Sequence, residues 1–255
     1  MITGLDHLVV AVTDLDAAER AYAECGFSVI PGGIHPLNGT RNALIPFPGG
    51  MYIELITFER PNPAHRWWEL AQENAGFVDA CYGSSDFEED GETMRRLGLE
   101  MQPAVSLSRQ WPDGRTAEWM LMIPSARFRR NWPFLICDKT HRDERIPRQT
   151  DPQAFGITGV DCVDIVVEDF PVTAEDARRE GFRATVDREP SLGAEVLTIG
   201  VETPIRFLSP IVPGSLSEHL QRNGPSFWRV LFRRQSGGAL WWTDGGAGPL
   251  FAAQD

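Results

Sequence analysis

The chain has 255 residues, with 36 acidic and 24 basic side chains and a formal net charge of −12. This length supports one large domain or two small ones, and the acidic balance without a long basic run excludes an electrostatic footprint for nucleic acid or an anionic membrane surface. No apolar stretch approaches the ~20 residues of a membrane span, the first predicted strand leaves no room for a signal peptide, and the four cysteines form no C-x-x-C pair. We therefore expect a cytoplasmic protein with reduced thiols and no nucleic-acid or membrane partner.

The first predicted element is a strand over residues 5–12, followed by an amphipathic helix. Apolar residues alternate along the strand, so Leu8 and His7 belong to opposite faces. The helix covers the face of Leu8, with Asp14 or Asp16 as its N-cap. His7 is therefore expected on the side opposite the helix.

A frame of glycine, aspartate and glycine surrounds this unit and occurs three times along the chain. In each copy the aspartate comes ten positions after the first glycine, and the second glycine comes twelve positions after the aspartate. The three copies are Gly4, Asp14 and Gly26; Gly76, Asp86 and Gly98; and Gly159, Asp169 and Gly181. His7 occupies the same position in its copy as Asp79 and Cys162 do in theirs. A repeated β-α unit is therefore predicted, with a different side chain at one shared position.

Turn-rich segments separate further strand candidates in the first two units. After the helix, the first unit has strand candidates at 27–30, 42–46 and 51–58. Residues 59–75 are predicted to form a loop and a connecting helix. The second unit has strand candidates at 77–83, 103–109, 117–123 and 133–138. Both units have the order β-α-β-β-β.

The remaining chain predicts a third unit and part of a fourth. Strands are expected at 183–187, 194–199 and 204–210, a short helix at 216–221, and a further opening strand at 224–232, after which a Gly-rich segment leaves only a strand or hairpin. The fold class is α+β with repeated βαβββ modules. The predicted organisation is a paired-module domain at 1–138 (modules 4–58 and 76–138), a linker at 139–158 and a third module with a truncated fourth at 159–255.

The first two units carry several distinctive motifs. The opening strand reads GLDHLVVAVTDL, and the closing strand of the first unit, over residues 52–56, reads YIELI. Further motifs are Gly32-Gly33-Ile34-His35-Pro36, Gly39-Thr40-Arg41-Asn42-Ala43-Leu44 and Pro133-Phe134-Leu135-Ile136. Together these motifs resemble the vicinal oxygen chelate superfamily, in particular its glyoxalase-like domain group. The resemblance covers residues 4–138 well and the third unit through its frame, and implies the glyoxalase, bleomycin resistance and dihydroxybiphenyl dioxygenase fold.

The resemblance implies an enzyme with a divalent metal in a cleft between two modules. Such proteins are isomerases, lyases or dioxygenases that act on small oxygen-rich molecules, which chelate Mn, Fe, Zn or Mg at open coordination positions. Their ligands are a His or Gln on the opening strands and a Glu on the closing strands. Carried over, His7 and Glu54 are ligands of the first module and Asp79 supplies a third. No nucleotide cofactor is expected.

The second and third modules depart from this ligand pattern. Cys137, or Asp138 if the register slips by one, is expected near the closing Glu of the second module, and Arg206 stands at that position in the third. If the first and third modules paired, Arg206 would form an ion pair with Glu54 and disfavour a metal. Pairing of the neighbouring first and second modules is the simpler expectation.

Each candidate residue also has an ordinary structural interpretation. A lone carboxylate within an apolar strand, such as Glu54, requires a partner or a wet pocket, whereas His7 is either a ligand or a pocket-lining imidazole. His35 lies in a Gly/Pro-rich loop that can close over the cleft or serve only the turn. The predicted catalytic residues are His7, Glu54 and His35. The predicted substrate-binding residues, which otherwise belong to loops or core, are Asn42, Thr40, Tyr52, Trp119 and Phe134.

Six arginines lie near the predicted linker, namely Arg127, Arg129, Arg130, Arg142, Arg145 and Arg148. A solvated loop is the expected interpretation, because charge clusters usually face water, and an anion-binding rim is the alternative. Two other functions stay open for the whole chain. One is a metal-free protein that binds or sequesters a small molecule, and the other is a scaffold whose extra module makes a homodimer.

Overall fold

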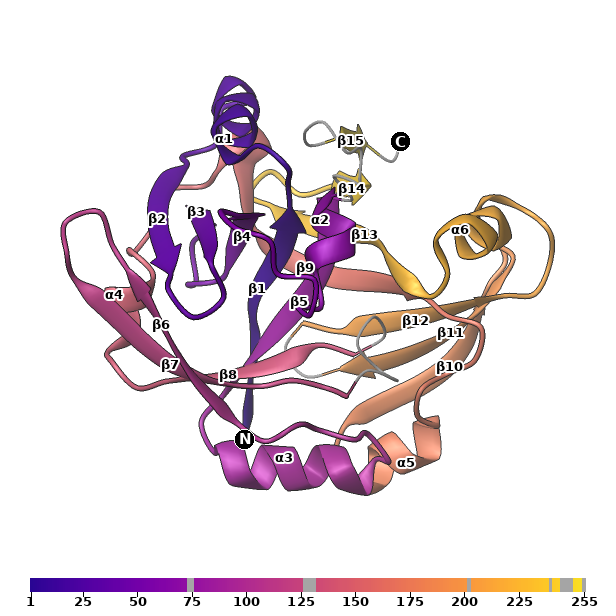
Figure 1. Ribbon diagram of the computed structural model, residues 1–255. Coiled ribbons are helices and arrows are strands. Elements are labelled where there is room, and N and C mark those ends of the chain that lie inside the picture. Colours follow the sequence, from indigo (N-terminus) through magenta and orange to yellow (C-terminus); the bar gives the residue numbers. More distant parts are fainter. Residues whose placement is uncertain (73–75, 126–131, 201–202, 239, 244–249, 254–255) are drawn as a thin grey trace.

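The computed structural model describes residues 1–72, 76–125, 132–200, 203–238, 240–243 and 250–253. Within these ranges the strands form two sheets, one a closed barrel in the order β1-β4-β3-β2-β6-β7-β8-β5 and the other a seven-stranded sheet in the order β10-β11-β12-β9-β13-β14-β15 (Figure 1). The predicted α+β fold of repeated βαβββ modules is confirmed. None of the described helices is long and apolar enough to cross a membrane.

The first module follows the predicted order, with one shifted strand. Its elements are β1 (Ile2–Ala11), α1 (Leu15–Glu24), β2 (Ile30–His35), β3 (Thr40–Pro46) and β4 (Tyr52–Phe58). The strand expected at 27–30 instead runs from Ile30 to His35, through the glycines that had suggested a turn. Pairing with β3 over this length explains the shift, since Ile30 lies opposite Leu44 and His35 opposite Thr40.

The second module repeats this order after a short connecting helix. Its elements are α2 (Trp68–Gln72), β5 (Gly76–Ser84), α3 (Phe87–Arg96), β6 (Val105–Gln110), β7 (Thr116–Met122) and β8 (Phe134–Asp138). The side chains of Asp14 and Asp86 cap α1 and α3 by accepting bonds from the backbone N–H groups of Ala17 and Glu89. The repeated aspartate thus has the same structural role in both modules.

The third module and the truncated fourth form the second sheet. Their elements are β9 (Ile157–Val166), α5 (Ala174–Arg179), β10 (Arg183–Glu189), β11 (Ala194–Gly200), β12 (Ile205–Pro210), α6 (Ser215–Asn223), β13 (Ser226–Arg234), β14 (Leu240–Thr243) and β15 (Leu250–Ala253). Strand β13 pairs antiparallel with β9, as β5 pairs with β1. The fourth unit therefore consists of an opening strand and a hairpin, as predicted.

Strand register settles which residues correspond between modules. Val9, two residues after His7, lies opposite Glu54, and Cys81, two residues after Asp79, lies opposite Phe134. Phe134 therefore stands at the position of the closing Glu in the second module, and the expectation of Cys137 or Asp138 there was wrong. Modules one and two share the barrel.

The third module keeps its arginine within its own sheet. Arg206 lies opposite Asp164 and holds both oxygens of its carboxylate at 2.6 and 2.7 Å, while Arg229 adds a third contact at 2.6 Å. The ion pair considered between Arg206 and Glu54 is therefore replaced by one to Asp164.

Two apolar clusters lie on opposite faces of the barrel strands. Leu8 and Val10 belong to a large cluster outside the barrel that also contains Leu15 of α1, whereas Val9 and Ala11 belong to a cluster inside it. The outer cluster extends into the second sheet, where Phe207, Val230 and Phe232 are buried. The two sheets therefore share one apolar core, and the inner cluster lies separately inside the barrel.

The segment between the two sheets is not a simple solvated loop. It contains α4 (Arg142–Arg145) and a short 3-10 turn at Ala154–Gly156. Arg145 has only 1% of its surface exposed, whereas the side chain of Arg148 is 77% exposed. The solvated-loop expectation was thus wrong for Arg145, and Arg127, Arg129 and Arg130 lie outside the described residues.

Candidate active site in the barrel

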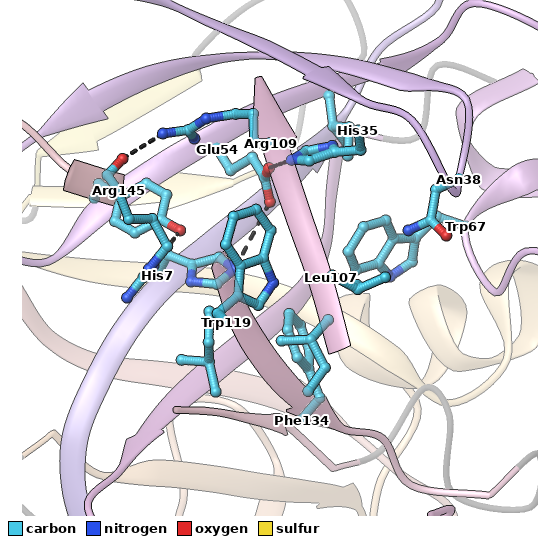
Figure 2. A pocket seen from close by; sticks show the side chains of 14 residues that line it. His7, His35, Asn38, Glu54, Trp67, Leu107, Arg109, Trp119, Phe134 and Arg145 are labelled. Atoms are coloured by element: carbon cyan, nitrogen blue, oxygen red, sulfur yellow. Dashed lines mark hydrogen bonds and ion pairs between the residues drawn. The ribbon is translucent and has the colours of Figure 1, made fainter. Parts of the chain in front are cut away.

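A pocket opens into the barrel and combines a polar wall with an apolar one (Figure 2). Its empty space, with the open mouth included, is about 450 Å³. The polar lining consists of His7, His35, Asn38, Tyr52, Glu54, Arg109 and Arg145, and the apolar lining of Ile56, Trp67, Leu107, Trp119, Leu121, Phe134 and Ile136.

Glu54 lies at the centre of the polar wall, between two imidazole rings. Its Oε2 is 3.7 Å from Nε2 of His7, and its Oε1 is 3.9 Å from Nε2 of His35. Its side chain is 9% exposed, and among the described residues no Lys or Arg reaches it within 4.0 Å. A buried carboxylate without a fixed cation is unusual and marks a candidate functional group.

The ring of His7 is oriented from behind by Asp6. Nδ1 of His7 lies 2.7 Å from Oδ1 of Asp6, and the ring stacks on Tyr52 at a centroid distance of 4.6 Å. Burial alone would raise the pKa of Asp6, but the charge of Arg145 and the hydrogen bonds from His7 and Arg145 hold it well below its ordinary value. Ionised Asp6 accepts a hydrogen bond from Nδ1 of His7 and orients the ring, so Nε2 faces the pocket.

Arg145 from the connecting segment fixes this arrangement. Its two terminal nitrogens donate to both oxygens of Asp6 at 2.9 Å, one also donates to the Tyr52 hydroxyl at 2.8 Å, and its Nε donates to Asp138 at 2.5 Å. Arg142 contacts Asp6 as well. Sequence reasoning missed Arg145 because its partner Asp6 is 139 residues away.

His35 and Glu54 are supported by two of the predicted substrate-binding residues. Oγ1 of Thr40 lies 2.9 Å from Nδ1 of His35, and Nδ2 of Asn42 donates to Oε1 of Glu54 at 2.5 Å. Neither Thr40 nor Asn42 is among the pocket-lining residues. Burial lowers the pKa of His35 to about 4, with the charge of Glu54 opposing the shift, so its ring is neutral near pH 7.

The apolar wall brings together the predicted aromatic residues. Trp119 meets the ring of His35 edge-on at 5.7 Å, and Phe134 meets His7 at 5.4 Å. Tyr52, stacked on His7, joins them from β4. These rings hold the two imidazoles in place and offer an apolar surface to a bound molecule.

Asp79 is placed apart from this constellation by its partners. Its Oδ2 accepts from Trp67 Nε1 at 2.7 Å and contacts Arg66 at 2.6 Å, and its Oδ1 accepts from the backbone of Ala80. Burial raises the pKa of Asp79 to about 6, against the opposing charge of Arg66. The contacts with Trp67 and Arg66 tie Asp79 to the segment that carries these two residues.

A metal with three protein ligands does not fit the donors as they stand. His7 and Glu54 face each other, but Asp79 is bound by Arg66 and Trp67, and Phe134 replaces the second module's carboxylate. Among the described residues, the group of three potential metal ligands whose atoms all lie within 4.8 Å of one another consists of Asp6, His7 and Cys81. There Asp6 is held by two arginines, and burial raises the pKa of the Cys81 thiol well above its usual value. Cations already occupy the neighbourhood where a metal would need anionic donors.

A closed barrel of two βαβββ modules, with a pocket inside and a histidine and a glutamate on its first and fourth strands, defines a protein of the vicinal oxygen chelate type. A family model described as a glyoxalase-like domain matches residues 5–180, and the chain belongs to that family. No curated protein matches the chain by sequence.

Two of the solved structures that match share the fold over nearly the whole chain. A hypothetical protein from Staphylococcus aureus matches with a TM-score of 0.65 at 14% identity, over 97% of each chain. A xylose isomerase-like TIM barrel/4-hydroxyphenylpyruvate dioxygenase fusion protein matches with a TM-score of 0.50 at 11% identity, over 98% of this chain and 48% of that one. Methylmalonyl-CoA epimerase from Mycobacterium tuberculosis matches with a TM-score of 0.39 at 21% identity, over 54% of this chain and 87% of that one.

Proposed function

We propose that the protein is an enzyme that moves a proton on a carbon atom next to the carbonyl group of a small organic molecule, in the manner of an isomerase, epimerase or lyase. The observation that carries this proposal is Glu54, a buried carboxylate that lines the pocket without a Lys or Arg partner among the described residues. Glu54, His7 and His35 are the proposed catalytic residues. The substrate's apolar part lies against Trp119 and Phe134.

Glu54 acts as the base in this proposal. Its carboxylate takes the proton from the carbon, and the electron pair of the broken C–H bond moves to the carbonyl oxygen to give an enolate. The amide of Asn42 holds Oε1 and leaves Oε2 directed toward His7. Return of the proton to the same face of this carbon restores the substrate with its hydrogen exchanged, and return to the opposite face gives the epimer. If the carbon carries a hydroxyl, return of the proton to the former carbonyl carbon, with the hydroxyl proton passing to the enolate oxygen, gives the isomer. If the next carbon carries a leaving group, the electron pair of the enolate expels that group, as in a lyase.

The two imidazoles have different roles because their environments differ. His7, with Nδ1 bonded to Asp6, presents a basic Nε2 on the same side as Glu54 and can exchange the proton with it. His35 is neutral and carries one ring proton. When Thr40 donates its hydroxyl to Nδ1, that proton is on Nε2, where it can bond the developing enolate oxygen.

Exchange of carbon-bound hydrogen for deuterium, followed by NMR in D₂O over a panel of small carbonyl compounds, tests this proposal. We expect exchange with the wild type and a loss of about a hundredfold or more in Glu54→Gln, the usual range for removal of a general base. The matched control is Glu59→Gln, which removes an exposed carboxylate just after the same strand, paired with Arg41. Unchanged exchange in folded Glu54→Gln would overturn the role of Glu54 as the base, and no exchange by the wild type with any compound of the panel would favour a binding protein.

A further inference from the structure

Arg109 is a buried cation without a carboxylate partner in this pocket. Only 1% of its surface is exposed, and no Asp or Glu among the described residues lies within 4.0 Å of its guanidinium. The other buried or half-buried arginines near the pocket are all paired. Arg66 contacts Asp79, and Arg142 and Arg145 contact Asp6.

The guanidinium of Arg109 is held in place by neutral groups. One terminal nitrogen donates to the backbone carbonyl of Arg145, and the group lies over the ring of Trp111 at 4.2 Å from its centroid. Its Nε is buried and has no hydrogen-bond partner. Burial lowers the pKa of Arg109 to about 10, with the charge of Glu54 opposing the shift, so the group is still cationic at neutral pH.

The burial of Arg109 without a charge partner destabilises the folded protein unless a bound group interacts with the guanidinium. A buried charge without a partner destabilises a protein, and an unsatisfied buried donor adds to the cost. Arg109 lines the same pocket as Glu54, on its polar wall (Figure 2). A bound anion would supply both the missing charge and the missing acceptor.

We propose that the ligand of this pocket is a small carboxylic acid, whose carboxylate binds Arg109. Its body packs on Leu107, Trp119 and Phe134. The part of this inference that places an acidic C–H of the ligand toward Glu54 rests on the proposed function, whereas the binding of the carboxylate by Arg109 does not. A planar guanidinium suits a planar carboxylate, and an uncharged amide of the same shape lacks the charge.

Titration calorimetry with matched acids and amides tests this inference. The probes are pyruvate and pyruvamide, lactate and lactamide, and phenylacetate and phenylacetamide. We expect at least one acid to bind roughly tenfold or more tightly than its amide, and Arg109→Gln to remove that preference. Arg115→Gln is the control, because Arg115 also lies over Trp111 but is 55% exposed and paired with Asp113.

Two further variants keep the outcome interpretable. Arg109→Lys retains the charge and should keep part of the preference even if Arg109→Gln does not fold. Glu54→Gln removes a negative charge from the pocket, so it should bind the acid at least as well as the wild type even though it loses proton exchange. Acid binding that survives in Glu54→Gln while wild-type exchange is absent would refute the proposed function alone. If no acid is preferred over its amide, or folded Arg109→Gln keeps the preference, the inference is overturned.

Discussion

His7, Glu54 and Arg109 show how single side chains in this barrel obtain their properties from their neighbours. Glu54 is buried without a fixed cation, His7 has its tautomer set by Asp6, and Arg109 is buried without an anion. The states of Glu54 and Arg109 are unfavourable for an isolated protein group, because each buries a charge without a partner. Together they define a pocket prepared for a molecule that carries an acidic C–H and a negative charge.

The neutral state of His35 gives a pH dependence of stability. In the unfolded chain His35 takes up a proton near pH 6.5, whereas in the folded protein its pKa is about 4. The unfolded state therefore binds more protons between these values, so the contribution of His35 is complete above pH 6.5 and is lost as the pH falls toward 4.

Replacement of His35 by Gln should remove this dependence. Between pH 7.5 and 4.5, the free energy of unfolding of the wild type, measured in urea, should fall by about 2 to 3 kcal/mol more than that of His35→Gln. This figure follows from about 1.4 kcal/mol per unit of pKa shift. His141→Gln is the control, because the side chain of His141 is 72% exposed. Equal acid sensitivity of wild type and His35→Gln would contradict the assignment of a neutral, buried imidazole.

Secondary-structure elements show what the sequence pattern could and could not predict. Alternation of apolar residues predicts the faces of β1 and β4, and with them His7 and Glu54 in the interior, because a strand has a period of two. The same alternation could have found Arg109, which shares its strand face with Leu107. Arg145 carried no such local signal, since its role depends on pairing with a distant strand.

The third copy of the frame shows a limit of repeat spacing. Asp14 and Asp86 cap their helices, but α5 is capped by Thr173, four residues after Asp169. Phe170 and Pro171 follow Asp169, and proline disfavours helical backbone at the residue before it. The repeated spacing therefore marks a helix in all three copies, but its aspartate caps that helix in only the first two.

The seam between β2 and β6 depends on a glycine. A Cβ at Gly33, where φ is +150°, would lie 2.0 Å from the carbonyl oxygen of Gln110 and 3.3 Å from Cγ of Arg109. Ile34 and Gln110 are the paired residues that close the barrel here. A side chain at position 33 would therefore separate the strands and displace Arg109.

Gly33→Ala should destabilise the protein by roughly 2 kcal/mol or more, because backbone atoms must move, and should weaken acid binding. Gly114→Ala is the matched control, since Gly114 also has a positive φ of +88° but has no neighbouring atom within 4 Å of its Cβ position. We expect Gly114→Ala to lower the free energy of unfolding, measured in urea, by about 1 kcal/mol. Equal effects of both substitutions would contradict the steric role of the seam.

The whole molecule behaves as two sheets on one core. Phe77 of the barrel packs on Phe227 at 4.8 Å, Trp132 stacks on Phe207 at 5.6 Å, and the hydroxyl of Tyr82 donates to the carbonyl of Thr203 at 2.7 Å. Helices α3 and α5 lie side by side at one end (Figure 1), joined by an ion pair between Arg96 and Glu180. The proposed boundaries at 138 and 159 therefore divide the sequence but not the core.

The shared core predicts joint unfolding of both sheets. In urea, tryptophan fluorescence and near-ultraviolet circular dichroism should follow one coincident transition. Two separated transitions would show instead that the barrel and the second sheet are independent domains.

The measurement that tests the central claim most directly is hydrogen–deuterium exchange of the substrate by protein freed of metal with a chelator. In the proposed function the donors around Glu54 form an acid and base site rather than a three-ligand metal centre, because arginines already hold Asp6 and Asp79. We predict that the exchange rate is unchanged by chelation and by later addition of Mn²⁺, Fe²⁺, Zn²⁺ or Mg²⁺. A rate that disappears on chelation and is restored by one of these cations, in the wild type but not in His7→Ala, would contradict the account.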